Sequence, residues 1–332
     1  MKKNQLTFFA CPKCRAEFAL VAGKPDSDGR IETGLLKCTG CHQSYDIRDY
    51  IPRFVPQENY AQGFGLEWSR HCFTQYDSYA GIPFSETRFF QETRWPRNLE
   101  GETILEVGCG SGRFTEQAAK TGAMVISVDL SHAVEANYAL NGGRKNVLIA
   151  QADIYRLPFK NKFFDRIFCL GVLQHTPDVR QAFLSLARYL KPGGCLVVDV
   201  YRKYPLWMRF LDTKYLVRPF TTKIEPDTLY RWCDRYVNFM WPLTKLFNKI
   251  PKLGRHVNRS LFVTDFSHKY PLSEAVAREW ALLDTFDRLS PAYDQPQYRR
   301  TLQKWFEEAA LENIEIGYGY NGIEGRGTSP QN

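Results

Sequence analysis

The sequence predicts an α/β fold, a doubly wound and mostly parallel sheet with a small cysteine-bearing ribbon before it and a helical insertion after its fifth strand. Three observations lead to this prediction. Short apolar runs alternate with helical segments over residues 103–201, which is the pattern of repeated strand–helix–strand units. Two C-x-x-C pairs precede this region, and a basic, aromatic-rich segment follows it.

The composition is that of an ordinary globular protein. The chain has 332 residues, of which 44% are hydrophobic and 24% are charged, enough to bury a full core. No apolar run approaches the ~20 residues that a membrane-spanning helix needs, and residues 1–5 do not read as part of a signal peptide. We therefore expect a cytoplasmic protein.

The ribbon is predicted over residues 1–56, from the cysteines Cys11, Cys14, Cys38 and Cys41. Two C-x-x-C knuckles can place four thiolates at the corners of a tetrahedron, the closed site that structural Zn²⁺ prefers. We predict a zinc ion that holds the fold and takes no part in the chemistry. Two disulfides or a redox-active dithiol are the alternatives for this spacing.

Residues 57–98 carry many aromatic side chains at helical spacing. One interpretation is that these side chains pack the ribbon onto the main domain. A few members mix polar and aromatic groups on one face, which suits a binding site better than a core. They are Trp68, Arg70, His71, Gln75 and Tyr76.

The segment 103–115, T-I-L-E-V-G-C-G-S-G-R-F-T, reads as a buried strand, a glycine turn and the start of a helix. Glycines on alternate residues allow positive φ angles and let a ligand approach the backbone closely. The third glycine comes one residue earlier than in G-x-G-x-x-G, and Glu106 precedes the turn, which favours a cation over a phosphate. A tight turn in an ordinary α/β domain is the alternative.

The elements after the turn follow from their apolar patterns. They are a helix over 113–120, strands over 124–129, 147–150 and 163–169, a helix over 179–190 and a fifth strand over 195–201. Asp129 ends the second strand, where a carboxylate can accept both ribose hydroxyls of an adenosine. The alternative is that Asp129 only caps the next helix, although both roles can coexist.

The motif E-x-G-x-G-x-G, followed in order by Asp129, Asp153-Ile154, residues 171–175 and the K-P-G-G of 191–194, resembles the pattern of class I S-adenosylmethionine-dependent methyltransferases. The resemblance covers about a hundred residues. It implies a seven-stranded Rossmann-like sheet, S-adenosylmethionine as methyl donor, and contacts of Asp153 and Ile154 with the adenine. The expected cofactor-binding residues are Glu106, Gly108, Cys109, Gly110, Gly112, Asp129, Leu130, Asp153, Ile154, Leu170 and Gly171.

The resemblance also divides the chain. Residues 99–202 and 299–332 would form the methyltransferase core, and residues 57–98 a helical lid or linker. Residues 203–298 would form a helical substrate cap, because insertions after the fifth strand lie where ligands bind. The tail 318–327 is glycine-rich, so the sequence leaves open whether the family's antiparallel seventh strand forms.

The basic charge of the chain lies in the predicted cap. Residues 201–260 hold thirteen Lys and Arg against four Asp and Glu, a net charge of +9, so the other residues sum to about −1. Large apolar residues interleave with these charges, which suits an anionic or lipid-linked acceptor and peripheral membrane contact through 203–260. A solvated helical face with extended Lys and Arg side chains is the alternative.

The reaction that the resemblance implies is methyl transfer by in-line displacement. His175 follows the fourth strand and is the candidate general base, although a structural role is the alternative. Tyr201, with Arg202, would orient the acceptor. We expect a small-molecule, glycan or lipid-linked acceptor in biosynthetic tailoring. Ribosomal RNA methylation through ribbon and cap, and a non-catalytic cofactor-binding protein, are the alternatives.

Overall fold

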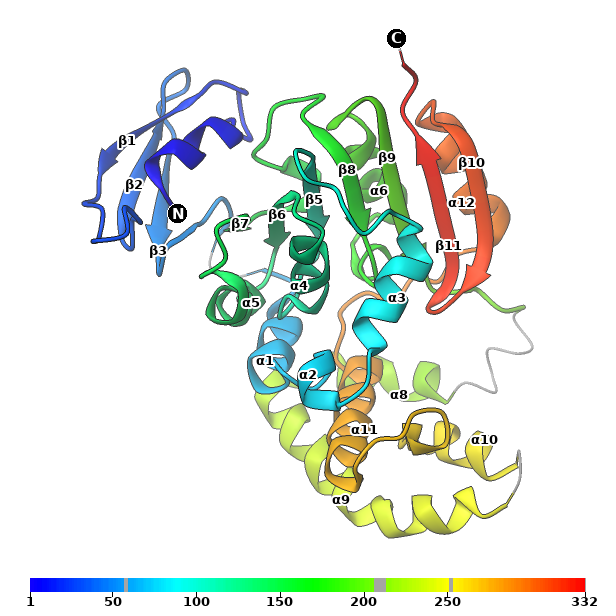
Figure 1. Cartoon of the computed structure of the whole chain (residues 1–332). Coiled ribbons are helices and arrows are strands. Elements are labelled where there is room, and N and C mark those ends of the chain that lie inside the picture. The colour runs from blue at the N-terminus through cyan, green and yellow to red at the C-terminus, as the bar shows by residue number, and fades with distance from the viewer. Residues whose placement is uncertain (57–58, 206–212, 251–252, 332) are drawn as a thin grey trace.

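The computed structural model describes residues 1–56, 59–205, 213–250 and 253–331 (Figure 1). A seven-stranded sheet forms the centre of the molecule. The ribbon lies beside one edge of this sheet, and a group of helices lies below one end of its strands. Among the described residues no helix is both long and apolar enough to cross a bilayer.

The central sheet has the order β10-β11-β9-β8-β5-β6-β7. Strands β5 to β9 are parallel. Strand β11 runs antiparallel to β9, and β10, antiparallel to β11, runs in the same direction as β5 to β9. This is the predicted doubly wound, mostly parallel sheet. The strands are β5 (Thr103–Val107), β6 (Met124–Asp129), β7 (Val147–Gln151), β8 (Phe164–Cys169), β9 (Leu190–Val200), β10 (Glu312–Gly319) and β11 (Gly322–Thr328).

Helices cover both faces of the sheet because successive residues of each strand point to opposite sides. Leu105 faces a core built with α6, α12 and the ribbon, whereas Ile104 faces a core built with α3, α4 and α5. The helices are α3 (Phe84–Thr93), α4 (Arg113–Lys120), α5 (Ala133–Asn141), α6 (Val179–Ala187) and α12 (Arg299–Glu308).

Two sequence-based expectations at the far edge need correction. The helix predicted to reach residue 190 ends at Ala187. Leu190 is already the first residue of β9, where it pairs with Phe164 of β8. The K-P-G-G segment, which falls between the predicted helix over 179–190 and the predicted strand over 195–201, lies inside β9, where the register shifts. Lys191 anchors this irregular start to Asp165, with Nζ 2.8 Å from Oδ2.

The glycine-rich tail forms the strand β11, between β10 and β9. Its glycines make room for a side chain of α12, since a Cβ on Gly325 would lie 2.6 Å from Cε2 of Phe306 and one on Gly327 2.8 Å from its Cδ1. The edge that the sequence left open is therefore a complete antiparallel hairpin.

The ribbon is a four-stranded antiparallel sheet made of β1 (Phe18–Ala22), β2 (Gly34–Cys38), β3 (Ser44–Arg48) and β4 (Ile51–Pro52). It attaches to the β7 side of the core through its own side chains. Phe9 stacks on Phe159 with 5.7 Å between ring centroids, and Arg53 pairs with Glu135 at 3.1 Å. The aromatic residues of 57–98 are not what joins ribbon and core.

Most of those aromatic residues instead lie on three helices between the sheet and the lower helices, α1 (Gln62–Arg70), α2 (Asp77–Ala80) and α3. Phe89 packs edge-on against Phe168 of the sheet, and Phe84 packs against Trp280 below it. Helix α1 packs on α5, on α9 (Pro226–Asn248) and on α11 (Glu274–Leu289). We refer to residues 59–95 as the lid segment.

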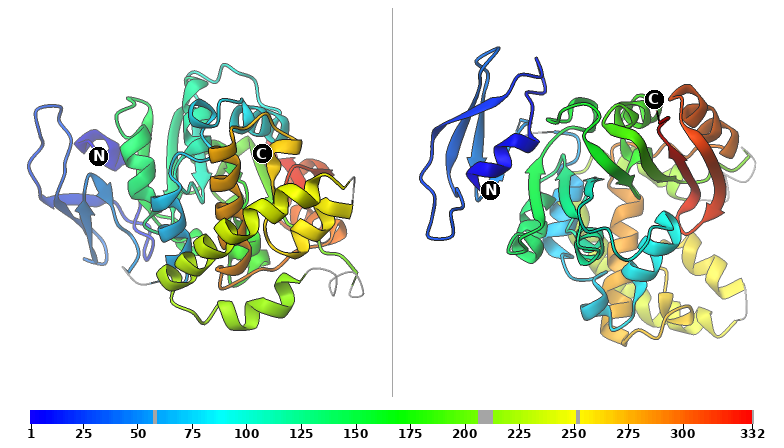
Figure 2. Two further views of the ribbon diagram at one scale, coloured as in Figure 1. Left: turned by 90° about the horizontal axis from the view of Figure 1, so that it is seen from below. Right: turned by 45° about the horizontal axis from the view of Figure 1, so that its top comes forward.

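The insertion after β9 is helical and has a core of its own. Its helices lie together at one end of the molecule in both figures (Figures 1 and 2). They are α8 (Lys214–Thr221), α9 (Pro226–Asn248), α10 (Leu253–Ser260) and α11 (Glu274–Leu289). The exact domain boundaries remain predictions.

Candidate functional site

A cavity of about 350 Å³ lies between the carboxyl ends of the parallel strands, helix α1 and helix α11. The glycine turn after β5 forms one wall. Helix α1 contributes a second wall through Phe64, Glu67 and Trp68, and α11 contributes a third through Asp284 and Asp287. This is the position where open α/β sheets bind their ligands.

The glycine turn has the left-handed backbone that its sequence suggested. The φ angles are 78° at Gly108, 51° at Gly110 and 91° at Gly112, a region that favours glycine. The space above each glycine is filled by protein, since a Cβ on Gly108 would lie 2.2 Å from Val172 and one on Gly110 3.1 Å from Nε1 of Trp68. The turn therefore lets the lid segment and the sheet close tightly around the cavity.

Asp129 lines the cavity at the end of β6. Its Oδ2 accepts a hydrogen bond from the Gly110 amide at 3.0 Å, and its Oδ1 accepts one from the Ser131 amide at 2.8 Å. Burial raises the pKa of this carboxyl. Oδ1 also accepts a bond from the Ser131 hydroxyl at 2.7 Å. Of the carboxylate's about four lone-pair positions, the one that stays open to a ligand hydroxyl is therefore on Oδ2.

Three expected cofactor residues are not among those that line the cavity, namely Glu106, Gly112 and Asp153. Glu106 is buried behind the turn, where its carboxylate accepts hydrogen bonds from the hydroxyls of Thr115 and Ser127. Burial raises its pKa to about 7. Asp153 accepts a bond from the Tyr155 amide at 3.0 Å.

The other expected cofactor residues do line the cavity, and so do both candidate catalytic residues. They are Gly108, Cys109, Gly110, Asp129, Leu130, Ile154, Leu170, Gly171, His175 and Tyr201. The structure thus brings together residues that are up to about ninety positions apart in the chain.

Arg113, which the sequence did not single out, follows the glycine turn directly and lines the same cavity. Its Nη1 is buried without a hydrogen-bond partner, and its guanidinium lies 4.3 Å from the ring centroid of Phe114. Burial, with the neighbouring Arg88, lowers its pKa to about 9, so it stays charged at neutral pH. A buried, unpaired cation at a helix N-terminus is suited to a carboxylate ligand.

Arg88 also lines the cavity, but it is paired with two carboxylates. Its Nε lies 2.6 Å from Glu92 and its Nη2 lies 2.7 Å from Asp199 of β9. Asp199 also accepts a hydrogen bond from the Gly171 amide. This buried network joins the lid segment to the sheet. Arg113, in contrast, has an unpartnered nitrogen beside the glycine turn.

His175 is oriented by a backbone contact. Its Nδ1 lies 2.9 Å from the carbonyl oxygen of Tyr293, so Nδ1–H donates and Nε2 keeps its lone pair. The ring stands edge-on to those of Phe64 and Tyr201, with centroids 5.1 Å and 5.3 Å away. The tautomer fixed by this bond is the one that can accept a proton.

Tyr201 donates a hydrogen bond to Asp287 at 3.3 Å. Burial, followed by the charges of Asp287 and Asp294, raises the pKa of the phenol well above its usual value. Tyr201 therefore keeps its proton at neutral pH, and it is suited to holding an acceptor rather than to deprotonating it.

The cavity also contains three carboxyl groups that the sequence did not indicate, those of Glu67, Asp284 and Asp287. Glu67 is 1% exposed, and its Oε2 has no hydrogen-bond partner. Burial, together with the charges of Asp287 and Asp284, raises its pKa well above the usual value. Asp284 and Asp287 lie on α11, outside the family resemblance, so only their place in the fold reveals them.

A second cavity of about 580 Å³ adjoins the first, sharing His175, Tyr201, Asp284 and Asp287. We call it the outer cavity. Cationic side chains outnumber acidic ones along its wall, and they include Arg202, Lys214, Arg218, Arg259 and Arg288. Lys214 pairs with Asp294 at 2.7 Å. The reacting end of the site is thus acidic, whereas the outer cavity is basic.

The lid residues singled out from the sequence divide into two groups. Trp68 and Gln75 line the cavity. Arg70 pairs with Asp227 at 2.5 Å, and His71 is buried, with Nε2 2.9 Å from the Tyr230 hydroxyl. These two residues join the lid segment to helix α9.

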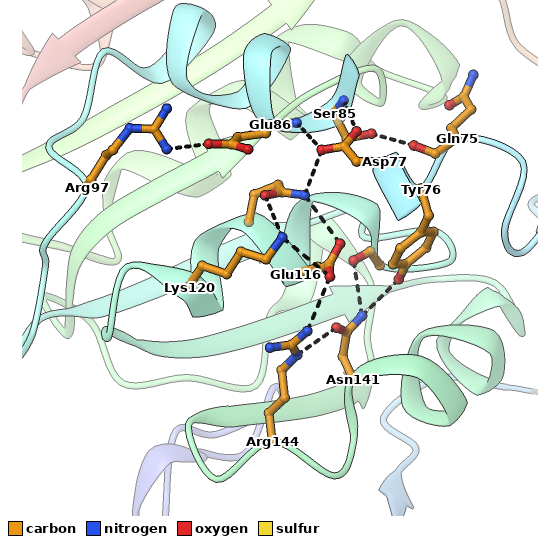
Figure 3. A network of polar contacts seen from close by, with 12 residues as sticks. Gln75, Tyr76, Asp77, Ser85, Glu86, Arg97, Glu116, Lys120, Asn141 and Arg144 are labelled. Carbon is orange, nitrogen blue, oxygen red and sulfur yellow. Dashed lines mark hydrogen bonds and ion pairs between the residues drawn. The ribbon is translucent and has the colours of Figure 1, made fainter. Parts of the chain in front are cut away.

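Tyr76 and Asp77 fasten the lid segment to the sheet domain (Figure 3). The Tyr76 hydroxyl donates to the Ser111 carbonyl at 2.8 Å and accepts from Asn141 at 2.9 Å. Asp77 accepts bonds from the backbone amide of Ser85 at 2.6 Å and from a side-chain amide of α4 at 3.2 Å. The wall over the glycine turn is therefore held on two sides.

The four ribbon cysteines meet at one point, with their sulfur atoms within 4.8 Å of one another. Sγ of Cys11 lies 3.6 Å from that of Cys41, and Sγ of Cys14 lies 3.3 Å from that of Cys38. A tetrahedral zinc site with bonds of about 2.3 Å places its sulfurs about 3.8 Å apart, whereas a disulfide needs about 2.05 Å. The arrangement is compatible with zinc, and the four cysteines are free thiols.

Comparison with known proteins adds the family. Residues 105–198 match the family described as "Methyltransferase domain". The chain is 34% identical over 146 residues to a ubiquinone biosynthesis O-methyltransferase of Alkalilimnicola ehrlichii, covering 40% of this chain and 59% of that protein. It is 38% identical over 148 residues to the protein of that name from Coxiella burnetii, covering 41% and 63%.

Among solved structures, an arsenic(III) S-adenosylmethionine methyltransferase of Chlamydomonas reinhardtii is 29% identical, with 35% of this chain and 45% of that chain covered and a TM-score of 0.30. The chain thus spans less than two thirds of the length of each of these relatives. The matched segment contains the glycine turn, Asp129 and His175. Residues 105–198 therefore form a methyltransferase domain, and its fold and glycine turn are similar to those of class I S-adenosylmethionine-dependent methyltransferases.

Proposed function

We propose that the protein transfers a methyl group from S-adenosylmethionine to a small-molecule acceptor. One observation carries this proposal: the glycine turn and a group of proton-handling side chains line the same cavity. When bound, S-adenosylmethionine supplies a methyl group on a sulfonium that is already an activated leaving group. The chain has only to align the acceptor, remove its water and accept its proton.

The residues at the glycine-turn end fit the donor. Asp129 has a free acceptor position on Oδ2 for a ribose hydroxyl, and Leu130 and Ile154 offer apolar surface to the adenine. Arg113, with its unpartnered Nη1, offers a charge to the carboxylate of the methionine part. These assignments are proposals about the individual residues.

The residues at the other end would handle the acceptor. His175 presents the lone pair of Nε2, and Glu67 presents a buried carboxyl oxygen, Oε2, without a hydrogen-bond partner. His175 can take the acceptor's proton, and so can Glu67 in its ionised form. Tyr201, whose hydroxyl donates to Asp287, would orient the nucleophile by accepting a hydrogen bond from it. Walls from α1 and α11 enclose this end, which favours a small nucleophilic group.

The basic outer cavity supports an acceptor that also carries an anionic group, such as a phosphate or a carboxylate. A glycan or lipid-linked intermediate in biosynthetic tailoring would provide such a group. The relatives named as ubiquinone biosynthesis O-methyltransferases support an oxygen nucleophile on a small molecule. For RNA as acceptor we find no comparable support, because the ribbon and the basic helices lie at different ends of the molecule (Figures 1 and 2).

We further propose that the ribbon holds one structural Zn²⁺ on Cys11, Cys14, Cys38 and Cys41. Four thiolates complete the tetrahedron and leave no position for a substrate, so the ion would stabilise the fold. Because this site requires reduced cysteines, we propose that the protein works in the cytoplasm.

The test is transfer of labelled methyl groups. Zinc-loaded protein is incubated with methyl-labelled S-adenosylmethionine and either the small-molecule or the RNA fraction of a cell extract. We expect label in a small molecule, and at least about tenfold less with His175→Gln or Glu67→Gln. Label found in RNA alone would contradict the proposal. So would labelling by the unaltered protein that equals the labelling by both variants and by a heat-denatured control.

A further inference from the structure

Helix α9 exposes a line of large apolar side chains to solvent. Their exposed fractions are 54% for Trp232, 74% for Phe239, 40% for Leu243 and 55% for Leu246. Steps of seven, four and three residues bring these side chains to one side of an α-helix. We call these four residues the α9 stripe.

The opposite side of α9 is a normal buried face. Leu229, Cys233, Val237 and Trp241 lie in the core that α9 shares with α11. The stripe is therefore not needed to hold the helix in place. An apolar row of this length facing water is unusual for a protein that acts alone in solution.

Basic side chains follow one edge of the stripe. Arg231, Arg235 and Lys249 succeed one another on this edge at helical spacing, and all three are exposed. Among the described residues, neither Arg235 nor Lys249 contacts a carboxylate, whereas Arg231 pairs with Asp227 at 3.3 Å. These charges belong to the segment 201–260, whose net charge is +9.

The neighbouring helices extend the same kind of surface. Helix α8 exposes Leu216 by 59% and Phe220 by 72%, and helix α10 exposes Leu253 by 61%. Helices α8, α9 and α10 lie together at one end of the molecule in both figures (Figures 1 and 2). The exposed apolar residues are thus concentrated in the most basic part of the chain.

We propose that the α9 stripe and its basic edge bind the surface of an anionic phospholipid bilayer. Trp, Phe and Leu on one face of a helix, with Arg and Lys beside them, are the composition of a helix that lies in a membrane interface. Negative headgroups complement the local charge of +9. A second copy of the chain is disfavoured, because its stripe would bring an equal positive charge to the contact.

The proposed surface adjoins the site. Lys214 and Arg218 of α8 and Arg259 of α10 line the outer cavity. Docking through these helices would bring that cavity near the lipid surface, where a lipid-linked or amphipathic acceptor is found. Binding to the bilayer itself does not depend on the proposed methyl transfer, so the two proposals can fail separately.

Vesicle sedimentation tests the inference with the zinc-loaded, full-length protein. Vesicles of phosphatidylcholine with phosphatidylglycerol should bind the protein, and vesicles of phosphatidylcholine alone should bind it at least about tenfold less well. The double variant Phe239→Ser/Leu246→Ser should weaken binding to the mixed vesicles by at least about tenfold. Arg235→Glu/Lys249→Glu should weaken it by a similar factor, with a smaller dependence on salt.

Matched controls use equally exposed residues elsewhere. Val21 and Tyr318 are 53% and 59% exposed, so Val21→Ser/Tyr318→Ser removes similar apolar surface outside the cap. Lys13→Glu/Lys24→Glu reverses two exposed charges of the ribbon. We expect both controls to bind vesicles like the unaltered protein. An unchanged circular dichroism spectrum shows that each variant is folded.

Three results would overturn the inference. The first is no binding to the mixed vesicles, and the second is an equal loss in the stripe variant and its control. The third is self-association of the protein that Phe239→Ser/Leu246→Ser abolishes while vesicle binding is absent, which would make the stripe a contact between copies of this chain.

Discussion

Replacing Arg113 by Gln should weaken the binding of S-adenosylmethionine while leaving the fold intact. Nη1 of Arg113 is buried without a partner, and the guanidinium rests on the rings of Phe84 and Phe114, at 5.6 Å and 4.3 Å from their centroids. No carboxylate among the described residues pairs with it. Its charge is therefore available to the ligand, and removing it should not break an internal ion pair.

The magnitude follows from the type of bond. A hydrogen bond to a charged group contributes about 1.5–3 kcal/mol, so affinity should fall by about tenfold to about a hundredfold. Because the pKa of Arg113 is lowered to about 9, the measurement is made near pH 7.5, where the side chain is charged. The melting temperature should stay equal or rise, since the variant removes a buried atom without a partner.

Equilibrium dialysis with two ligands isolates the contact. S-adenosylmethionine has the methionine carboxylate, whereas 5′-methylthioadenosine keeps the nucleoside and lacks it. Arg113→Gln should weaken the first and leave the second nearly unchanged. Lys120→Gln, on the last turn of the same helix, serves as the matched control. An equal loss for both ligands, or no loss for S-adenosylmethionine, would refute the role assigned to Arg113.

Three further outcomes are expected. Burial raises the pKa of Glu67 above its unfolded value, so this carboxyl destabilises the fold as pH rises. Glu67→Gln should therefore raise the melting temperature at pH 8 more than at pH 5. An equal shift of the melting temperature at both pH values would contradict this. Cys14→Ser should lower the zinc content, measured by plasma mass spectrometry, at least about tenfold from one ion per chain, and unchanged zinc would exclude Cys14 as a ligand. Gly325→Ala should cost about 1–3 kcal/mol in urea unfolding, because its Cβ would meet Phe306, whereas Gly317→Ala on β10 has open space; equal costs would refute the steric account.

The sequence predicted the strands of the sheet well because most of them are buried on both faces. The runs at 124–129 and 147–150 are nearly continuous in apolar residues, and the structure has β6 and β7 at these positions. The helix over 113–120 was equally clear, because the glycine turn marks its start. Local patterns are informative wherever burial alone decides the choice of side chain.

The start of β9 and the strand β11 could not be predicted in this way. In both cases the decisive contacts come from another element. Lys191 is held in the strand by Asp165, and the glycines of β11 are required by the ring of Phe306. A K-P-G-G run and a glycine-rich tail look like turns until those partners are placed beside them.

The candidate site was predicted at the level of the backbone more than of the side chains. The glycine turn and Asp129 lie where their spacing suggested. Glu106 does not face the cavity, because it bonds to Thr115 and Ser127 behind the turn. Motif spacing gives the position of a residue but not the direction of its side chain. Glu67 and Asp284 had no motif at all, since only the packing of α1 against α11 brings them together.

The most direct test of the central claim is calorimetric titration of the zinc-loaded, full-length protein with S-adenosylmethionine. The geometry of the cavity predicts one binding site per chain, with an affinity weakened by Asp129→Asn, because this side chain lines the cavity beside the glycine turn. Saturable binding of one ligand would support the account. No binding at concentrations far above those at which S-adenosylmethionine acts as a substrate would contradict it.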